Sequence, residues 1–595
     1  MTTSPHRHSV LFLSGASILL AALTTTVAWA LVQLINLITN LAFYQRASFL
    51  SVTPAENQMG LAVVVVPVIG GLIIGVMARY GSKAIRGHGI PEAMEQILLN
   101  RSRIPARITV LKPVSAAISI GTGGPFGAEG PIIATGGALG SLLGQIFSVT
   151  ASERKTLLAA GAAAGMAAIF GSPVSAVLLA IELLLFEFSA RSLVPVALAC
   201  ATASAVRLWF FGSEPIFVMP EVQVTGPAFL FTFCVLGACV GVAATFISRA
   251  VYLVEDQFER LPIHWMWWPA IGAIGVGMIG YVAPQTLGVG YVNIEQIVSN
   301  AFPIQLVAWI CTMKLISWLI ALGSGTSGGT LAPLLTIGSG LGTMLAVAVN
   351  HLVPELDLPI GLSALVGMTA MFAGASRALL ASIVFAFETT MQPYALPALL
   401  AGSTAAFLVS HLLSRHSIMT EKIARRGVSV PHSYAPDPLA QIRVADVMAN
   451  EYQTISATMT VDELATGIAT HVPAVARRHA SLIVDQAQRL VGIITRSDVL
   501  RAVDSGQHSL TVQEAGGSQL VVAYEDETLR EALVKMLQHK VGRLPVVNRS
   551  DLQRAVGYLG RAEILTAQSL EVREPGWIER RFARAETLDD TSSST

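Results

Sequence analysis

Eight stretches of this chain are apolar enough and long enough to cross a lipid bilayer. They lie at about residues 9–44, 60–78, 192–211, 226–250, 267–284, 304–323, 331–352 and 393–413. A membrane-spanning helix needs about 20 predominantly apolar residues, and the first stretch is far longer than the apolar part of a cleaved signal peptide. The sequence therefore predicts an all-α polytopic membrane protein over most of its length.

Shorter apolar stretches, broken by Gly and Pro, lie between the long ones. They fall at about residues 107–125, 130–149, 155–170, 173–186, 361–373 and 376–388. A bilayer tolerates broken helices only where the loose backbone is buried in protein or lines a cavity. Interrupted helices at matching places in two halves of a chain are typical of a transport site.

Charge divides the chain into two parts. Residues 428–595 carry 38 charged side chains in 168 positions, whereas residues 1–427 carry 38 in 427 positions. The charged fraction of residues 428–595 is close to the roughly 25% that is typical of an ordinary soluble domain. We therefore expect a membrane part at 1–427, a linker at 428–441 and a soluble part after it. The net charge of zero argues against a nucleic-acid partner.

The membrane part contains an internal duplication. Gly127-Ala-Glu-Gly-Pro131 and Gly329-Thr-Leu-Ala-Pro333 each precede an apolar helix. Later in each half, a turn of small residues leads into an apolar helix that ends in Glu182 or Glu388. The two loops and the two glutamates are separated by nearly the same distance along the chain. Two ordered matches at nearly one offset predict two repeats of about 200 residues.

Three glycine-rich loops share the spacing Gly-x-x-x-Pro. Proline suits the first position of a helix, so each loop is expected to end at a helix N-terminus with free N–H groups. Such ends attract anions through their donors and their dipole together. The candidate anion-binding residues are Gly87, His88, Gly89, Ile90, Pro91, Gly127, Ala128, Gly130, Pro131, Gly329, Thr330, Leu331, Ala332 and Pro333.

Glu129 lies inside the second of these loops. A carboxylate within a membrane protein core is costly and is usually functional. At a helix N-terminus it can occupy the place of an anion, and protonation would release it. Glu129 is therefore the candidate gate and proton carrier.

With these loops the chain resembles the CLC family of chloride channels and chloride/proton exchangers, over roughly residues 9–427. The loops are similar to the family patterns G-S-G-I-P, G-[KR]-E-G-P and G-x-F-x-P, with His88, Ala128 and Leu331 at the altered positions. Ser324-Gly-Thr-Ser-Gly-Gly329 and Glu388 also fit. The resemblance implies an inverted repeat, a homodimer with one pore per subunit, cytoplasmic termini, and transport of chloride or a similar small anion. A proton-coupled antiporter is the alternative to a voltage- or pH-gated channel.

The chain departs from the family at the central anion site. There the family uses a Ser and a Tyr hydroxyl, and the corresponding positions here are His88 and Met419. The site is therefore expected to rely on the backbone N–H groups of Ile90, Thr330 and Leu331. The His88 ring is either an anion ligand and pH sensor or a ring bonded to a neighbouring carbonyl.

The proton path implied by the family is also altered. Exchangers of this family often carry a proton-transfer Glu at the position of Leu183, so Glu182 and Glu187 are the possible substitutes. Lys314 either raises the potential of the anion path or extends to an interface. Basic residues at 79–86 and 101–112 are expected in short loops as cytoplasmic anchors.

The soluble part contains two similar units, at 442–502 and 503–568, followed by a polar tail at 569–595. Leu490-Val-Gly-Ile-Ile-Thr-Arg-Ser-Asp-Val-Leu500 and Ala555-Val-Gly-Tyr-Leu-Gly-Arg-Ala-Glu-Ile-Leu565 match in order when Gly492 is aligned with Gly557. The pattern is similar to a pair of CBS domains, and the resemblance implies a small α/β domain for this part. The resemblance implies an adenine-nucleotide site at Thr495 and Asp498; the alternative is a dimerisation module without a ligand. Gly560 and Glu563 occupy the matching positions of the second unit.

Two other functions are disfavoured. A membrane metalloprotease needs a motif such as H-E-x-x-H, and the chain has none. A divalent-cation transporter needs intramembrane carboxylates, whereas these loops present N–H donors. We therefore expect no enzyme, no metal site and no required cofactor. We expect a protein of a bacterial-type inner or plasma membrane, with lipid, protons and a small anion as partners and with cytoplasmic CBS domains.

Overall fold

The computed structural model describes residues 5–147, 149–223, 226–426, 439, 442–472, 480–517 and 520–573. The chain divides into two compact units, Met1–Ala435 and Pro436–Thr595. The first is called here the membrane unit and the second the soluble unit.

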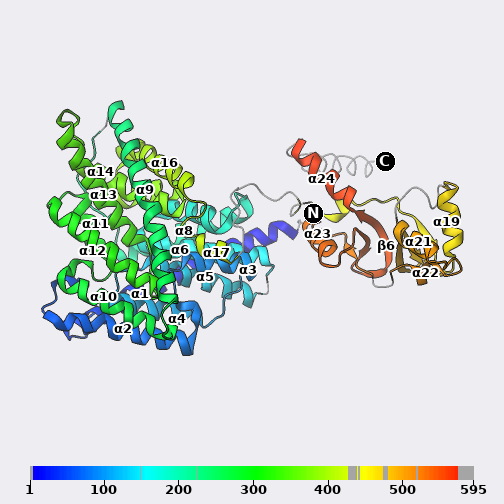
Figure 1. Ribbon diagram of the computed structural model, residues 1–595, viewed down its shortest axis with the longest axis horizontal. Helices are drawn as coiled ribbons and strands as arrows, with labels where there is room; N and C mark the ends of the chain where they lie inside the picture. Colours follow the sequence, from blue (N-terminus) through cyan, green and yellow to red (C-terminus); the bar gives the residue numbers. More distant parts are fainter. Residues whose placement is uncertain are drawn as a thin grey trace. The chain divides into compact units, whose positions relative to one another are not determined.

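The regular elements in the described part of the membrane unit are all helices, joined by loops and turns (Figure 1). The helices of its first half are α1 Pro5–Tyr44, α2 Val65–Val76, α3 Ile90–Leu99, α4 Ile108–Gly121, α5 Glu129–Ile146, α6 Ala151–Phe170, α7 Pro173–Leu179 and α8 Ala190–Phe211. Those of its second half are α9 Pro227–Glu259, α10 Trp268–Val282, α11 Tyr291–Val298, α12 Ile304–Gly323, α13 Leu331–Leu352, α14 Ile360–Ser376, α15 Leu379–Thr390, α16 Leu396–Leu413 and α17 Glu421–Arg425. Short 3-10 and π turns join them, namely η1 Pro54–Glu56, η2 Gly60–Val64, η3 Met77–Gly81, η4 Lys83–Ile85, η5 Ala180–Leu185, η6 Trp265–Trp267, η7 Pro284–Thr286, η8 Pro354–Leu356 and η9 Pro393–Ala395.

Eight helical segments among the described residues have the length and apolar composition of membrane spans. They are Val10–Tyr44, Gly60–Gly81, Ala190–Phe211, Phe229–Glu259, Trp265–Val282, Ile304–Gly323, Leu331–Leu352 and Pro393–Leu413. They coincide with the eight apolar stretches of the sequence, which confirms the predicted polytopic membrane fold. Large apolar side chains on their outer faces, such as Trp209 and Phe231, are exposed as a lipid-facing surface requires.

Helices of small residues form the interior of the membrane unit. Nearly every residue of α6 and α14 is buried, and most of them are Ala, Gly, Ser or Thr. A Cβ added at Gly136 of α5 would stand 2.1 Å from the Gly161 carbonyl oxygen of α6, and one at Gly367 of α14 would stand 2.4 Å from the Gly338 carbonyl oxygen of α13. Small residues let these helix pairs approach backbone to backbone, as membrane helices commonly do. The duplicated sequence thus builds two similar helix pairs.

The soluble unit contains two three-stranded sheets with the same topology. One sheet has the order β1-β2-β3 and the other β4-β5-β6; in each, the first two strands are parallel and the last two antiparallel. Its elements are α18 Val444–Val447, β1 Thr454–Ser456, α19 Val461–Ala469, β2 Ala480–Val484, β3 Leu490–Thr495, α21 Arg496–Asp504, α22 Val512–Ala515, β4 Ala523–Tyr524, α23 Leu529–Gln538, β5 Arg543–Asn548, β6 Asp551–Gly560 and α24 Arg561–Arg573. This arrangement confirms the predicted small α/β domain.

The two halves of the soluble unit exchange their first segments. Val444 lies in the hydrophobic core around β4, β5 and β6, and its N–H donates to the Glu527 carbonyl at 2.9 Å. Val512 lies in the core around β1 and β3, and its N–H donates to the Met459 carbonyl at 2.8 Å. Packing therefore crosses the predicted bounds of 442–502 and 503–568 in both directions, and those bounds stay predictions.

Candidate functional site

The three glycine-rich loops meet at one place inside the membrane unit. The N–H of Gly329 donates to the Gly127 carbonyl at 3.0 Å, and the N–H of Gly127 donates back to the Gly329 carbonyl at 3.3 Å. The first loop joins them, because a Cβ added at Gly130 would stand 2.2 Å from the His88 carbonyl oxygen. Three segments that are far apart in the sequence therefore form a single junction.

Each of these loops leads into a helix, but the proline positions differ from the prediction. Helix α3 begins at Ile90, α5 at Glu129 and α13 at Leu331. Pro91 is therefore the second residue of its helix, and Pro131 and Pro333 are the third, so the expected first position was wrong. The first four N–H groups of a helix have no intrahelical partner, which is why proline is tolerated at any of these places.

Glu129 is fully buried at this junction, and its carboxylate lies on the N-terminus of α13. The N–H of Ala332 donates to Glu129 Oε1 at 2.6 Å. The hydroxyl of Tyr291 donates to Glu129 Oε2 at 3.0 Å. A carboxylate from the first repeat thus lies on the N-terminus of a helix of the second repeat, where the helix dipole favours negative charge.

Tyr291 is a site residue that the sequence analysis missed. It begins α11, and its ring packs edge-on against Phe170 and Phe217, with ring centroids 5.7 Å and 6.3 Å away. The available signal was the repeat itself. Gly288-Val-Gly-Tyr-Val292 corresponds to Gly87-His-Gly-Ile-Pro91 in the first repeat, which places Tyr291 opposite Ile90.

Two buried lysines support these loops in the same way. Lys112 Nζ donates to the carbonyls of Ile85 and Gly87, each at 2.9 Å. Lys314 Nζ, at the matching place in the second repeat, donates to the carbonyls of Thr286 and Gly288, also at 2.9 Å. Lys112 is only 1% exposed inside α4, so the prediction of a loop anchor was wrong for it; its ammonium satisfies carbonyls that would otherwise be unpaired. Lys314 is 0% exposed and does not extend to an interface.

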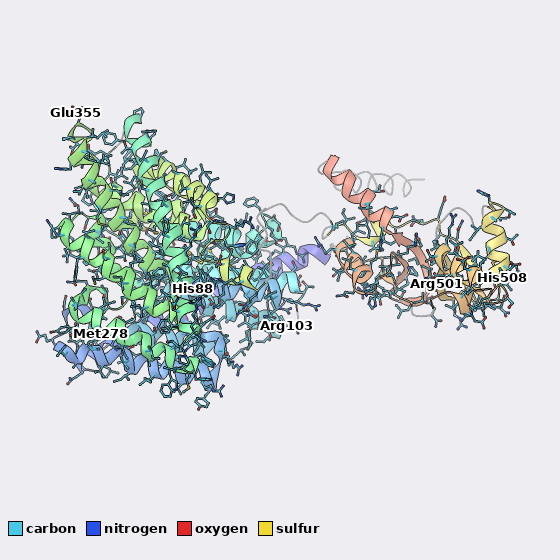
Figure 2. The ribbon with its side chains drawn as sticks, viewed as in Figure 1. His88, Arg103, Met278, Glu355, Arg501 and His508 are labelled. Atoms are coloured by element: carbon cyan, nitrogen blue, oxygen red, sulfur yellow. The ribbon has the colours of Figure 1, made fainter. Side chains whose placement is uncertain are left out.

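His88 lines a cavity of about 480 Å³, called here the His88 cavity. Figure 2 shows His88 within the membrane unit, whereas the exposed Met278 and Glu355 lie at its edges. The His88 side chain is 5% exposed, and its Nδ1 has no hydrogen-bond partner among the described residues. The cavity is also lined by Gly87, Lys112 and Tyr252.

Charged groups are among the residues that line the His88 cavity. Glu92, in the first turn of α3, accepts a hydrogen bond from the Gly89 N–H at 2.7 Å and pairs with Lys422 Nζ at 3.1 Å. Lys422 comes from the short helix α17. The sequence analysis did not single out this pair, because its members come from distant parts of the sequence and belong to no shared motif.

Met419, at the position where the family has a tyrosine hydroxyl, is fully buried. A tyrosine hydroxyl does reach this region from α9. Tyr252 lines the His88 cavity, and its hydroxyl donates to the Ile418 carbonyl at 2.7 Å.

Glu182 and Glu388 cap each other's helices. Glu182 accepts hydrogen bonds from the N–H groups of Leu380 and Ala381, at 3.0 Å and 3.1 Å, at the start of α15. Glu388 accepts from the N–H groups of Val174 and Ser175, at 2.9 Å and 2.8 Å, at the start of α7. Glu187 instead forms an ion pair of 3.7 Å with Lys155. The part of Glu182 and Glu187 in a proton path stays a prediction.

In the soluble unit, Thr495 and Asp498 bond to each other at the start of α21. The N–H and hydroxyl of Thr495 donate to Asp498 Oδ2 at 2.9 Å and 2.6 Å, and the Asp498 N–H donates back to the Thr495 hydroxyl. This is a capping box, and Thr511 with Glu514 forms a similar one at α22. The motif that the resemblance associates with a nucleotide thus also has a local structural role.

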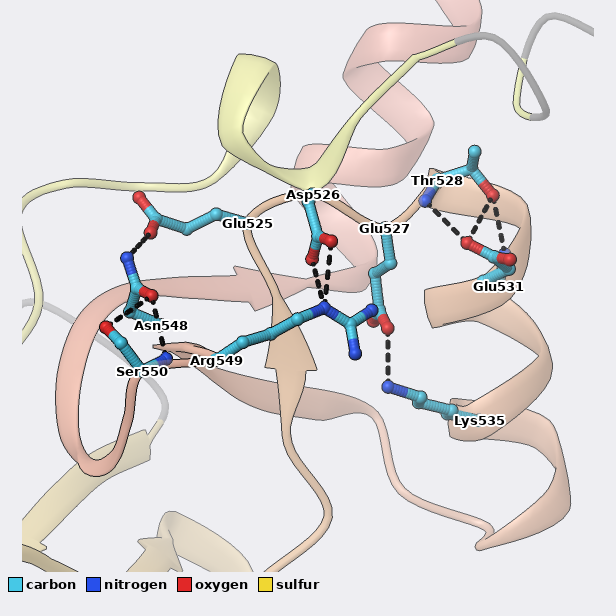
Figure 3. Close-up of polar contacts among 9 residues, drawn as sticks. All are labelled: Glu525, Asp526, Glu527, Thr528, Glu531, Lys535, Asn548, Arg549 and Ser550. Carbon is cyan, nitrogen blue, oxygen red and sulfur yellow. Dashed lines mark hydrogen bonds and ion pairs between the residues drawn. The ribbon is translucent and has the colours of Figure 1, made fainter. Parts of the chain in front are cut away.

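The second half of the soluble unit holds a compact polar cluster (Figure 3). Arg549 pairs with Asp526 at 2.8 Å, and the amide of Asn548 donates to Glu525 at 3.0 Å. Glu527 is 5% exposed and pairs with Lys535. Burial raises the pKa of Glu527, and the Lys535 ammonium opposes that rise. The pairs of Arg549 and Asn548 join the turn between β5 and β6 to the segment that precedes α23, and the pair of Glu527 and Lys535 joins that segment to α23 itself.

Known protein families match both units of the chain. The model of the family described as "Voltage gated chloride channel" matches residues 70–411, and that described as "CBS domain" matches residues 444–505 and 514–570. The chain is 27% identical over 365 residues to a putative chloride channel protein ClcB-like from Ralstonia nicotianae, covering 60% of this chain and 85% of that protein. It is 29% identical over 372 residues to the H(+)/Cl(-) exchange transporter ClcA of Vibrio campbellii, covering 60% and 79%.

Solved structures resemble the chain in fold. A slow cyanobacterial Cl-/H+ antiporter superposes with a TM-score of 0.63 at 22% identity, covering 71% of this chain and 99% of that one. A eukaryotic CLC transporter superposes with a TM-score of 0.60 at 17% identity, covering 93% and 98%. The similarity to the second extends over most of the chain.

Proposed function

The chain belongs to the family of voltage-gated chloride channels, the CLC family, and from that premise we propose that it carries chloride or a similarly small anion across a membrane. The anion passes the junction of the three glycine-rich loops, and the side chain of Glu129 gates it. The path uses backbone N–H groups and helix dipoles, which bind an anion without holding it too tightly for release.

The observation that carries this proposal is the position of the Glu129 carboxylate. It is fully buried on the N-terminus of α13 and accepts the Ala332 N–H. A chloride ion has the same charge and the same need for donors, so the carboxylate and the ion compete for one place. Protonation removes the charge of Glu129 and lets the ion take that place.

Chloride flux from vesicles that contain the purified chain tests the function. We expect release of trapped chloride that empty vesicles do not show, and faster release at pH 5 than at pH 8. Release at the rate of empty vesicles at both values would contradict the proposal. A pH electrode in the same experiment separates an exchanger from a channel. In an exchanger, chloride leaving the vesicles drives protons into them, whereas a channel moves chloride without protons.

Proton coupling is the alternative that one named relative favours, since it is an exchange transporter. The chain has Leu183 where such exchangers often carry a second Glu, and Leu183 is buried. Glu182 is bound to helix N–H groups and Glu187 to Lys155. If protons are coupled, one of these two carboxylates completes their path.

His88 is proposed as the side-chain ligand of the central anion site. Its buried Nδ1, which has no partner among the described residues of the His88 cavity, supports this, since buried polar atoms normally have a partner. The backbone N–H groups of Ile90, Thr330 and Leu331 complete the proposed donor set. The thioether of Met419 offers the anion no hydrogen-bond donor.

Replacing His88 by Ala is expected to weaken chloride binding about tenfold, because a hydrogen bond to a charged group contributes roughly 1.5–3 kcal/mol. His88→Ser is expected to restore part of it, since a hydroxyl can also donate. Titration calorimetry of the purified chain with chloride measures both. His411, which is exposed and stacks on Phe407, is the control position. Equal affinity of His88→Ala and the unaltered chain would rule out His88 as a ligand.

The assembly and location follow from the same proposal. The partly exposed carboxylates of Glu182 and Glu388 lie beside the exposed apolar residues Val174 and Leu380. A carboxylate facing lipid is costly, so a second copy of the chain is the proposed cover of this face, giving a homodimer. We further propose a bacterial inner or plasma membrane, with the CBS domains in the cytoplasm.

Adenine-nucleotide binding at Thr495 and Asp498 is a further part of the proposal, supported by the CBS match. Titration of the unit 436–595 with ATP, ADP and AMP tests it. Binding that is lost in Asp498→Asn and kept in Glu514→Gln is expected, because Glu514 belongs to a similar capping box without the motif. Absence of heat with all three nucleotides would favour a dimerisation module.

A further inference from the structure

Tyr291 gives Glu129 a hydrogen-bond donor that none of the glycine-rich loops supplies. The carboxylate has two oxygens on different partners. Oε1 takes the backbone N–H of Ala332 at 2.6 Å, and Oε2 takes the Tyr291 hydroxyl at 3.0 Å. The backbone donor belongs to α13 and would serve a chloride ion equally well. The Tyr291 hydroxyl comes from α11. Its hydrogen bond to Glu129 is present only while the carboxylate lies on the N-terminus of α13.

The tyrosine ring is held so that its hydroxyl points at Glu129. Phe170 and Phe217 pack edge-on against it, and Phe170 in turn packs on Phe385 with centroids 4.8 Å apart. The Tyr291 ring is therefore already ordered before its hydroxyl bonds to Glu129, which lowers the entropic cost of that hydrogen bond.

The backbone that carries Tyr291 is fixed as well. Gly288 and Gly290 have φ values of +71° and +80°, which turn the chain sharply into α11. Lys314 Nζ binds the carbonyls of Thr286 and Gly288 on this turn. Lys314 is fully buried, so the turn is attached to α12 from inside the protein.

The corresponding place in the first repeat lacks a side-chain donor. There Lys112 binds the carbonyls of Ile85 and Gly87 in the same manner, but Ile90 stands where Tyr291 stands in the second repeat. The same loop and lysine arrangement thus carries the apolar Ile90 at the start of α3 in the first repeat and the phenol of Tyr291 at the start of α11 in the second. The phenol is the one aimed at the proposed gate.

We propose that Tyr291 is a positioning residue that holds the ionised Glu129 carboxylate on the N-terminus of α13 and thereby sets the pH at which the gate leaves this place. The inference rests on the proposed role of Glu129. Besides the backbone N–H of Ala332, two titratable side chains of the described residues act on Glu129: Tyr291 from α11, through its hydrogen bond, and Lys314 from α12, through its charge. Since Tyr291 stabilises the ionised form in the closed position, its loss favours release at higher pH.

Anion flux by the reconstituted full-length chain, measured from pH 4 to pH 9, tests this with Tyr291→Phe. This substitution removes the hydroxyl and keeps the ring in its aromatic packing. We expect the pH of half-maximal flux to rise by about one unit, which corresponds to a tenfold weaker hold on the ionised carboxylate. Tyr44→Phe is the matched control, because it removes a hydroxyl that donates to the Thr53 carbonyl at 2.6 Å.

Two further variants separate the inference from the proposed function. Glu129→Gln combined with Tyr291→Phe is expected to behave as Glu129→Gln alone, because no carboxylate remains to be held. If Glu129→Gln changes the pH profile and Tyr291→Phe leaves it unchanged, Tyr291 has no positioning role, and the proposed gating role of Glu129 is kept. If Glu129→Gln itself changes nothing, the proposed function fails. A shift by Tyr291→Phe that persists in the Glu129→Gln background would overturn the inference, since it would act on another group. The thermal unfolding of each purified variant shows whether it is folded.

Discussion

Replacing Glu129 by Gln is expected to raise anion flux at pH 8 by about tenfold or more and to remove most of its dependence on pH. The amide is nearly the same size as the carboxylate but carries no charge. It therefore loses the charge-assisted bonds to the Ala332 N–H and the Tyr291 hydroxyl, each of which contributes roughly 1.5–3 kcal/mol. Any proton movement coupled to chloride should stop, because the side chain no longer titrates.

Flux measurements on vesicles between pH 4 and pH 9 check this expectation. Glu388→Gln is a suitable control, since Glu388 is also a carboxylate that accepts two N–H groups at a helix start. It lies on α15 and outside the loop junction, so its variant should keep the pH response. If Glu129→Gln retained the pH response of the unaltered chain, another group would have to be the gate.

Replacing Gly130 by Ala is expected to abolish transport and to destabilise the membrane unit by about 3 kcal/mol, the upper part of the usual range for overpacking. The new Cβ would stand 2.2 Å from the His88 carbonyl oxygen and 2.8 Å from Gly329 Cα. Both neighbours are backbone atoms of the other two loops, so neither can move away without opening the junction. The loss of transport and the loss of stability therefore have one cause.

Gly137→Ala is the matched control for this substitution. Gly137 lies on the same helix, and its nearest neighbour for an added Cβ is Leu158 Cδ2 at 3.4 Å, which is ordinary contact. Thermal unfolding and flux of the two purified variants are compared directly. Equal behaviour of Gly130→Ala and Gly137→Ala would mean that the close meeting of the three loops is not needed.

The sequence predicted the membrane unit well because its constraints are local. A span must be apolar over its whole length, and helices broken by glycine and proline are tolerated in a membrane only where their backbone is buried in protein or lines a cavity. The eight apolar stretches and the duplicated loops carried this information directly. The burial of Glu129 at a helix N-terminus agrees with what its loop motif indicates.

The residues that sequence reasoning missed act through tertiary contacts. The basic residues around Lys112 predict a loop, but its ammonium reaches the carbonyls of Ile85 and Gly87 from inside α4. Tyr291 was missed because its loop keeps the two glycines of the repeat and loses the proline. The pair of Glu92 and Lys422 joins segments from the two halves of the membrane unit. A residue-by-residue comparison of the two repeats would have found Lys112 and Tyr291, but not the pair of Glu92 and Lys422.

Chloride binding by the purified chain tests most directly whether the Glu129 carboxylate occupies the place of an anion. Titration calorimetry at pH 5 and pH 8 compares the unaltered chain with Glu129→Gln. We expect the unaltered chain to bind chloride more tightly at pH 5 than at pH 8, and Glu129→Gln to bind it with nearly equal affinity at both values. Identical affinities and identical pH dependence of the two proteins would contradict it.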